Sequence, residues 1–529
     1  MGATIRESLN WLHTWTGVVT GVVLFAIVWT GTVCVFDREI DRWMNPSTRI
    51  VYSGEPVSID PLRAEAQKLS PRGAPWTFVM PSPRDPAIWI GYRGRGGIER
   101  KFFDPLTLKE IAPPESWAGT RFLFPFHYTL HIKLWNIGTW LVGFAGAAMV
   151  ALCVTGVIIH RKIFIDFFTL RRARQPQRVL LDVHNGAGTL GFLFHIVMAF
   201  TGLTILGAVY FPSGLWVAFE GARSGFVREA YDTYSRPRLN QPGPPLGSLD
   251  AMVAHARDAW GGLQPNLVRV YHPGDANSYV EVRPSIQAEI EMRSDPFYFD
   301  AATGKVLHQT HLRQTTRLQQ FLTGLHFVQF KHWTLRWLYY VLGLLGCILI
   351  ATGFLFWIES RRKAHEASGS RGVIFVEGLT IGGTGGMVIA TLGFFIANRL
   401  LPSGATFLGG ARYELEIWTF FAVWILTFVH GWGRRETAWI EQCWAAAFLC
   451  VVAVFLNAMT TGDHIVRALI DGKVAVAGMD LVLIVSAGAA AYTAWRLQRR
   501  RQTVVPRIRH QSSQQSPSHP SQRLEGQSS

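Results

Sequence analysis

The chain has 529 residues, of which 49% are hydrophobic and only 16% charged, and it contains 20 Trp and 34 Phe. This composition excludes an ordinary soluble globular protein and indicates a membrane protein. We assign the formal net charge of +15 to basic residues beside membrane helices, so we expect the lipid bilayer, and not nucleic acid, as the partner. The five cysteines lie in or beside apolar runs without a C-x-x-C pair, which argues against a disulfide framework or a thiolate metal site.

Eight apolar runs are long enough to cross about 30 Å of hydrocarbon. The sequence therefore predicts an α-helical membrane protein with about eight transmembrane helices. No small-residue cleavage site of the A-x-A kind follows the first run, so we expect it to remain as an anchor. In chain order the predicted helices cover residues 9–36, 136–159, 186–211, 335–357, 374–397, 415–433, 439–458 and 474–495.

Basic residues cluster at alternate ends of these helices. Six Lys or Arg fall in the loop at 160–183 and four in the loop at 359–372, whereas the other short connections carry fewer. The positive-inside rule then places both termini in the cytoplasm. The two long polar segments, 37–135 and 207–334, are predicted to be periplasmic, with the protein in a bacterial inner membrane. The tail at 503–529 is rich in Gln, Ser, Pro and Arg and is predicted to be disordered and cytoplasmic.

The first four helices carry an internal duplication of His, Gly and Thr-Gly motifs at matching spacings. Each copy is a helix, a long polar segment and a second helix. The last four helices do not show the pattern and are predicted to form an appended unit. The two copies align as His13, Gly17, Thr30-Gly31 and Thr155-Gly156 with His184, Gly188, Thr201-Gly202 and Thr352-Gly353.

Both polar segments are too long for plain loops and contain alternating, strand-like stretches, so we predict a small α+β module in each. Each carries a Phe-Asp motif, at 103–110 and 299–306, and the second is predicted to form a hairpin turn. The first motif has Leu108 where the second has Gly304. The predicted divisions are 1–36 (helix), 37–135 (module), 136–206 (two helices and a basic cytoplasmic loop), 207–334 (module), 335–358 (helix), 374–495 (four further helices) and 503–529 (tail).

Histidines are the chemically distinctive residues of both copies. His13 and His184 occupy equivalent helix ends, so a pseudo-two-fold arrangement could bring both imidazoles to one haem iron between small residues. The structural alternative is that each anchors a helix end at the interface. His195 lies eleven residues after His184, about 16 Å along the same helix face. Deep in an apolar run, it is either a further haem ligand or a neutral, hydrogen-bonded residue.

A second duplicated pair, Leu130-His131 and Leu325-His326, follows the Asp of the Phe-Asp motif by 27 and 26 residues. It lies just before the second and fourth helices and could hold a second haem or meet the electron acceptor. His127 and His332 are alternatives, or else interfacial residues. At 1.5 Å per residue the pair lies about 40 Å from the cytoplasmic helix ends. That distance is long for one electron step unless the helices are broken near Asn136 and His332 or an intermediate haem is present.

These motifs resemble the PepSY-associated transmembrane proteins, often labelled iron-regulated membrane proteins, which include inner-membrane siderophore-iron reductases. The resemblance covers residues 1 to about 365. It implies PepSY-like periplasmic modules and a membrane haem protein that moves electrons to an iron chelate in the periplasm. With the histidine pattern above, we expect two b-type haems whose iron ligands come from His13, His184, His131, His326 and His195. The resemblance rests on Leu12-His13-x-Trp15-x-Gly17, Thr30-Gly31, the Phe-Asp hairpin, Leu130-His131, Val183-His184-x-x-x-Gly188 and Leu325-His326.

The leading hypothesis is an oxidoreductase that carries electrons outward and reduces a ferric siderophore or a similar iron chelate in the periplasm. The chain carries no convincing flavin or nicotinamide motif, so the electron donor would be a quinol or a separate cytoplasmic protein. Two rivals remain open. One is a non-enzymatic regulatory or partner-binding membrane protein whose histidines are structural, and the other is a transporter for iron or its siderophore.

Overall fold

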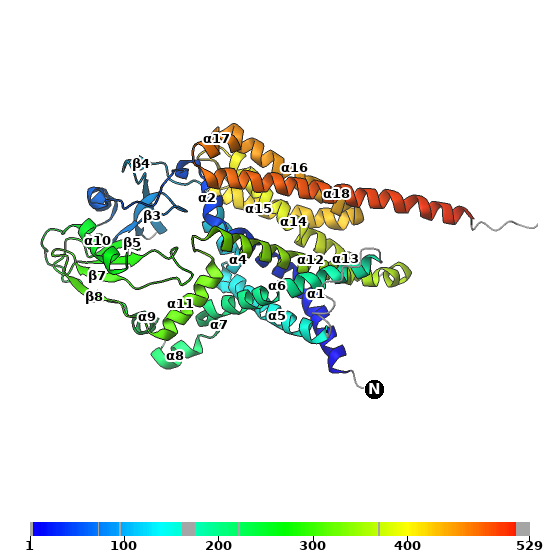
Figure 1. Ribbon diagram of the computed structural model, residues 1–529, viewed down its shortest axis with the longest axis horizontal. Helices are drawn as coiled ribbons and strands as arrows, with labels where there is room; N and C mark the ends of the chain where they lie inside the picture. The colour runs from blue at the N-terminus through cyan, green and yellow to red at the C-terminus, as the bar shows by residue number, and fades with distance from the viewer. Residues whose placement is uncertain are drawn as a thin grey trace, which may run out of the picture.

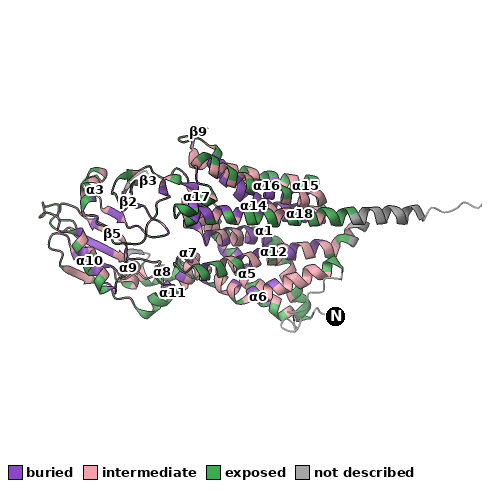
Figure 2. Ribbon diagram, turned by 45° about the horizontal axis from the view of Figure 1, so that its top comes forward, coloured by how far each residue is buried: buried purple, intermediate pink, exposed green. Residues whose placement is uncertain are grey.

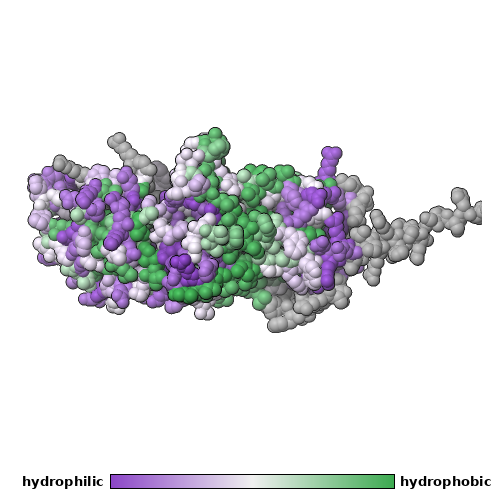
Figure 3. Space-filling view, turned by 90° about the horizontal axis from the view of Figure 1, so that it is seen from above, coloured by the Kyte–Doolittle hydropathy of each residue, from purple (hydrophilic) through white to green (hydrophobic). Residues whose placement is uncertain are grey.

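The computed structural model describes residues 4–71, 73–94, 97–160, 175–220, 223–368 and 371–514. A bundle of long helices is joined at one end to a domain built on a β-sheet (Figure 1). Hydrophobic residues form a broad belt over the bundle, between hydrophilic surfaces (Figure 3). We call the end of the bundle beside the sheet the sheet-side end and the other the distal end.

Eight of the described helical segments are long and apolar enough to cross a membrane, which confirms the predicted membrane α-helical fold. The third span begins earlier than predicted because Pro176, which lacks a backbone N–H, starts it in the first helical turn. The spans are built from α1 (Ile5–Cys34), η4 (Leu134–Asn136) with α5 (Ile137–Ile159), α6 (Pro176–Ile205), α12 (Trp333–Ser368), α13 (Arg371–Gly383) with α14 (Gly385–Leu400), α15 (Arg412–Arg434), α16 (Glu436–Thr461) and α18 (Val474–Gln514).

Two sequence predictions concern segments that lie partly outside the described residues. Helix α18 continues to Gln514, so its described part runs past residue 503, where disorder was predicted. Residues 515–529 lie outside the described ranges. So do residues 161–174, which hold most of the basic cluster of the first short loop.

The sheet domain combines the two predicted modules. Its eight strands follow the order β4-β3-β2-β1-β5-β6-β7-β8, and β1 pairs with β5 in antiparallel register, so the modules share one sheet. Helices α3 and α10 contribute to the core on one face of the sheet. The elements are η2 (Asp60–Leu62), α3 (Arg63–Leu69), β1 (Trp76–Val79), β2 (Ile88–Gly94), β3 (Gly97–Phe103), β4 (Glu110–Ile111), α10 (Leu249–Ala259), β5 (Pro265–Tyr271), β6 (Tyr279–Pro284), β7 (Phe297–Asp300) and β8 (Val306–Gln309).

The two Phe-Asp motifs form equivalent hairpin turns. In each, the Asp carboxylate accepts hydrogen bonds from the backbone N–H groups two and three residues ahead, at Asp104 and at Asp300. The turn closes through a residue with positive φ, Gly304 at 69° and Leu108 at 55°. Leu108 therefore adopts the left-handed conformation of the glycine at some steric cost.

The first four spans form one unit, and the last four pack beside it. The largest core cluster joins α1 and α2 (Asp37–Met44) with the appended helices. The α13–α14 span is the most deeply buried of the eight (Figure 2). The remaining elements are η1 (Pro46–Thr48), η3 (Ala118–Leu123), α4 (Phe124–Thr129), α7 (Gly207–Tyr210), α8 (Ser213–Phe219), α9 (Arg223–Tyr231), α11 (Gln314–Phe327), β9 (Thr406–Phe407), β10 (Gly410–Ala411) and α17 (Ile465–Ile470).

A buried charge cluster joins the sheet domain to the bundle. Glu39 of α2 pairs with Arg84, from the β1–β2 connection, at 3.1 Å and with Arg336 of α12 at 2.7 Å. Asp37 also pairs with Arg84, at 3.1 Å. Burial opposes ionisation of Glu39, but the two guanidinium groups outweigh it and hold the pKa of its carboxyl below the ordinary value. Both arginines also donate to the Val35 carbonyl, so the cluster fixes the end of α1.

Candidate functional site

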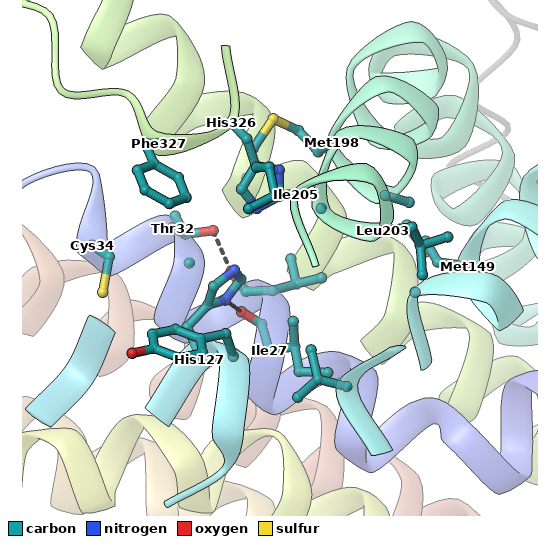
Figure 4. A pocket seen from close by; sticks show the side chains of 18 of the residues that line it. Ile27, Thr32, Cys34, His127, Met149, Met198, Leu203, Ile205, His326 and Phe327 are labelled. Carbon is teal, nitrogen blue, oxygen red and sulfur yellow. Dashed lines mark hydrogen bonds between the residues drawn. The ribbon is translucent and has the colours of Figure 1, made fainter. Parts of the chain in front are cut away.

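Two cavities lie inside the unit formed by the first four spans, one toward each end. The distal cavity has a volume of about 500 Å³ and is lined by His13 and His184. The sheet-side cavity has a volume of about 350 Å³ and is lined by His127 and His326 (Figure 4). Both volumes fall in the range typical of ligand pockets. Their lining residues lie between residues 10 and 361, so the first four spans and their connections build both cavities.

The distal pair consists of His13 on α1 and His184 on α6, which face each other. The ring centroids of His13 and His184 lie 6.4 Å apart. His184 Nδ1 lies 2.8 Å from the Leu349 carbonyl oxygen. Because a carbonyl only accepts, Nδ1 of His184 carries the proton, and in the neutral ring Nε2 keeps its lone pair. His13 Nδ1 lies 3.0 Å from Thr155 Oγ1, whose hydroxyl donates to the Ala151 carbonyl, so this Nδ1 is also the donor.

The sheet-side pair repeats the same chemistry. The ring centroids of His127 and His326 lie 6.0 Å apart, and Figure 4 shows the two rings facing one another. His127 Nδ1 donates to the Ile27 carbonyl at 2.8 Å, and His326 Nδ1 lies 3.0 Å from Thr201 Oγ1. Burial, with a smaller contribution from His127, lowers the pKa of His326 to about 3. The ring is therefore neutral, the form in which imidazole binds a metal.

Each of the four duplicated Thr-Gly dipeptides lies beside one of these histidines. Two threonines accept from a histidine directly, and the other two donate to the same carbonyl that accepts from the histidine. A Cβ on Gly31, Gly202 or Gly353 would crowd the ring, whereas one on Gly156 would only reach ordinary contact. The distance from that Cβ to the histidine Cε1 would be 2.7 Å for Gly31 and His127, 2.9 Å for Gly202 and His326, 3.2 Å for Gly353 and His184, and 3.4 Å for Gly156 and His13. We call these four dipeptides the Thr-Gly seats.

The separation of the rings in each pair would suit two imidazoles that share one metal. Imidazole nitrogens bind first-row metals at about 2 Å, so the ring centroids of two imidazoles on opposite sides of one metal lie about 6 Å apart. The two observed separations, 6.4 and 6.0 Å, fit this value. Within the described ranges no group of three or more His, Cys, Asp or Glu side chains could hold a metal by itself. Each pair would therefore supply two imidazole ligands to a bound metal.

Small residues line part of the distal cavity. Gly17, Gly21 and Gly188 line the distal cavity. Gly191 makes room for a histidine of its own helix, because its Cβ would lie 2.3 Å from His195 Cε1, and Gly21 makes room for Phe354, whose ring would lie 2.5 Å from a Cβ there. The walls of both cavities are largely apolar, with Leu24 and Met149 shared between them.

Two of the predicted site histidines occupy other positions. His131 lines neither cavity; its ring packs edge-on against Phe122, with centroids 5.6 Å apart, and near Phe421. His195 is buried between the two cavities and borders both. Its Nε2 lies 3.2 Å from the Leu342 carbonyl oxygen, and its Nδ1 makes no hydrogen bond within the described chain. The structure therefore pairs His326 with His127, one of the two alternatives, and leaves His195 between the pairs.

His131 matches the residue spacing of the second copy, but the turns of α4 and α11 place His127 and His326 at the cavity instead. Helices α4 and α11 each carry one histidine in their last turn and end at a left-handed residue, Leu130 with φ 49° and Val328 with φ 55°. These breaks allow each short helix to reach back against a long one. His127 contacts Ile27, seven residues inside the end of α1, which is about 10 Å.

The two histidine pairs are closer than the sequence predicted. Along α1, His13 lies 18 residues from Gly31, where His127 packs. Along α6, His184 lies 18 residues from Gly202, where His326 packs. At 1.5 Å per residue the two levels are about 27 Å apart, compared with about 40 Å for unbroken helices. The backbone is broken at Trp135 and Asn136, which both have positive φ. This break lies near one of the two positions where the sequence predicted that the helices would be interrupted.

Comparison with known proteins extends over the same part of the chain. Residues 10–360 match the family described as the PepSY-associated TM region. The chain is also 25% identical over 377 residues to an uncharacterized protein, PA4219, of Pseudomonas aeruginosa, covering 68% of this chain and 90% of that protein. The family match begins at the first residue that lines the cavities and ends one residue before the last. With more than half of its length matched, the chain belongs to the family of PepSY-associated transmembrane proteins.

Proposed function

We propose that this protein holds two b-type haems and carries electrons across a bacterial inner membrane to a ferric siderophore or a related iron chelate. The observation that carries the proposal is the repeated geometry of the histidine pairs. In both, Nδ1 is anchored to a hydroxyl or carbonyl oxygen and the ring centroids are 6.4 or 6.0 Å apart. Such anchoring fixes the tautomer and orientation of metal-binding histidines.

Haem bound in each cavity would supply a one-electron redox centre. His13 and His184 would hold the haem at the distal level, and His127 and His326 would hold the one at the sheet-side level. The Thr-Gly seats hold these four rings in place, and the apolar walls exclude water. His195 lies between the two levels, where a polarisable aromatic ring shortens the purely aliphatic part of the electron path.

The direction of transfer follows from the predicted topology. By the positive-inside rule the distal end faces the cytoplasm and the sheet domain the periplasm. A quinol or a cytoplasmic donor would then reduce the distal centre, and the chelate would be reduced beside the sheet domain. Reduction promotes release because Fe(II) carries less charge than Fe(III) and binds hard oxygen ligands more weakly.

The test is a reduced-minus-oxidised visible spectrum of the detergent-purified protein, with a pyridine haemochrome assay for stoichiometry. We expect b-type bands and two haems per chain in the wild type. His13→Ala and His184→Ala should each remove the distal haem, because one axial ligand is lost. His332→Ala is the control, since this exposed residue lines neither cavity.

A colourless wild-type protein, produced with ample haem, would overturn the proposal and favour the regulatory or the transport function. If the haems are present, the acceptor is tested separately. Protein in vesicles with reduced quinone inside should reduce a ferric siderophore added outside, and the rate should fall in the same histidine variants.

A further inference from the structure

The distal cavity has a polar end that the sheet-side cavity lacks. Its lining includes Ser360 and Arg361, which lie at the end of the fourth span. Asn10, His160 and Asn185 contribute further polar groups there. The described lining of the sheet-side cavity contains no Lys or Arg, and its polar groups are hydroxyls, a thiol and imidazoles. The two cavities therefore differ in charge although their histidine pairs are alike.

Arg361 is held at the cavity without an acidic partner. Its guanidinium carbon lies 4.3 Å from the centre of the Trp357 ring, and its Nη1 lies 3.2 Å from Ser360 Oγ. In the part of the chain that the structure describes, no carboxylate lies within salt-bridge distance of it. The next residue differs, because Arg362 is exposed and pairs with Glu359 at 2.8 Å. A partly buried guanidinium with free N–H donors beside an apolar cavity is suited to a carboxylate ligand.

We propose that Arg361 binds an ionised carboxylate of the molecule that fills the distal cavity. The inference rests on the proposed function, in which that carboxylate is a haem propionate. The apolar walls and the two imidazoles suit the ring of such a molecule, and the polar end suits its carboxylates. The distal haem would therefore be inserted with its carboxylates toward the distal end of the bundle.

This site makes the two redox centres unequal. A guanidinium near the haem, and its neutralisation of a propionate charge, both disfavour the ferric state, in which the iron carries the larger positive charge. Loss of Arg361 should therefore lower the midpoint potential of the distal haem. The sheet-side haem, at a level about 27 Å away along the helices, should keep its potential.

The experiment is a spectroelectrochemical titration of the full-length purified protein with both haems bound. We expect two components in the wild type, with the higher-potential one shifted downward in Arg361→Gln and less so in Arg361→Lys, which retains the charge. Arg362→Gln is the matched control and should leave both components in place. The haem component whose midpoint potential does not change in Arg361→Gln also shows that the variant is folded.

Haem affinity provides a second readout. A charge-assisted hydrogen bond to a carboxylate, when lost, weakens binding about tenfold or more, so titration of apoprotein should show that loss at one site of Arg361→Gln only. Two bound haems with unchanged potentials and affinities in Arg361→Gln would overturn the inference and assign Arg361 to a lipid phosphate at the membrane surface. A wild-type protein without haem would instead overturn the proposed function, and this inference with it.

Discussion

The two cavities use one local motif but obtain their histidines in different ways. At the distal level both histidines belong to membrane-spanning helices, α1 and α6, so the bundle alone determines their positions. At the sheet-side level they come from α4 and α11, short helices that follow the two modules of the sheet domain and reach back into the bundle. The distal site therefore depends on helix packing, whereas the sheet-side site also depends on how the sheet domain is attached.

The largest expected effect tests which histidine completes the sheet-side pair. His127→Ala should remove the sheet-side haem and leave about half of the wild-type haem content, because an axial ligand is lost. His131→Ala should keep both haems, since this ring packs against Phe122 outside the cavity. Pyridine haemochrome assays of the two variants decide the question. Loss of a haem in His131→Ala with retention in His127→Ala would mean that the short helices have a different register.

The attachment of the sheet domain can be weakened without touching either cavity histidine. Glu39→Gln leaves the buried guanidinium groups of Arg84 and Arg336 with less counter-charge, and breaking a buried ion pair in this way costs about 3–5 kcal/mol. Val35, which both arginines contact, lines the sheet-side cavity. In denaturant titrations followed in the haem bands, the sheet-side haem should therefore be lost first. The exposed pair Arg313–Glu229 offers a control, because Glu229→Gln should change stability by less than about 1 kcal/mol.

The Thr-Gly seats differ in tightness between the two levels. The Cβ of Gly31→Ala would lie 2.7 Å from His127 Cε1, whereas that of Gly156→Ala would lie 3.4 Å from His13 Cε1. Overpacking of this kind costs about 1–3 kcal/mol, so Gly31→Ala should weaken sheet-side haem binding by about 5- to 150-fold. Gly156→Ala should bind haem nearly as the wild type does. Equal affinities in the two variants would show that the seats do not limit the position of the rings.

The smallest expected effect is a pH dependence confined to the sheet-side end. Asp41 of α2 accepts a hydrogen bond from the Thr120 backbone N–H in η3, the segment that leads into α4. Burial raises the pKa of its carboxyl to about 7, against the Thr120 hydrogen bonds, which lower it. Between the ordinary value near 4 and about 7, the folded protein keeps a proton that the unfolded chain releases. Stability should therefore fall as pH rises through this window.

Thermal unfolding in detergent at pH 5 and pH 8 checks this prediction. The wild type should unfold at a lower temperature at the higher pH, and Asp41→Asn, which cannot ionise, should reduce the difference. The distal haem band should show the same midpoint in both proteins if the effect is local. A pH dependence that is unchanged in Asp41→Asn would assign it to other groups.

Features that depend on local composition and on the periodicity of apolar residues could be predicted from the amino-acid sequence. Eight apolar runs long enough for the bilayer correspond to eight spans, because a spanning helix must satisfy its backbone polar groups internally over a set length. The duplication was visible in the repeated His, Gly and Thr-Gly spacings, and the approach of His13 to His184 follows from it. The hairpin turn after Phe299 was predicted from turn residues between two strand-like stretches, and β7 and β8 pair as expected.

Contacts between distant segments are visible only in the three-dimensional structure. It joined two predicted modules into one sheet through the β1–β5 pair, and it paired His326 with His127 instead of His131. It also showed that the Thr-Gly dipeptides seat the histidines. The physical reason is that left-handed breaks at Leu130 and Val328 turn short helices back into the bundle. Residue counting along one chain cannot specify which ring then faces which, because that depends on packing between helices.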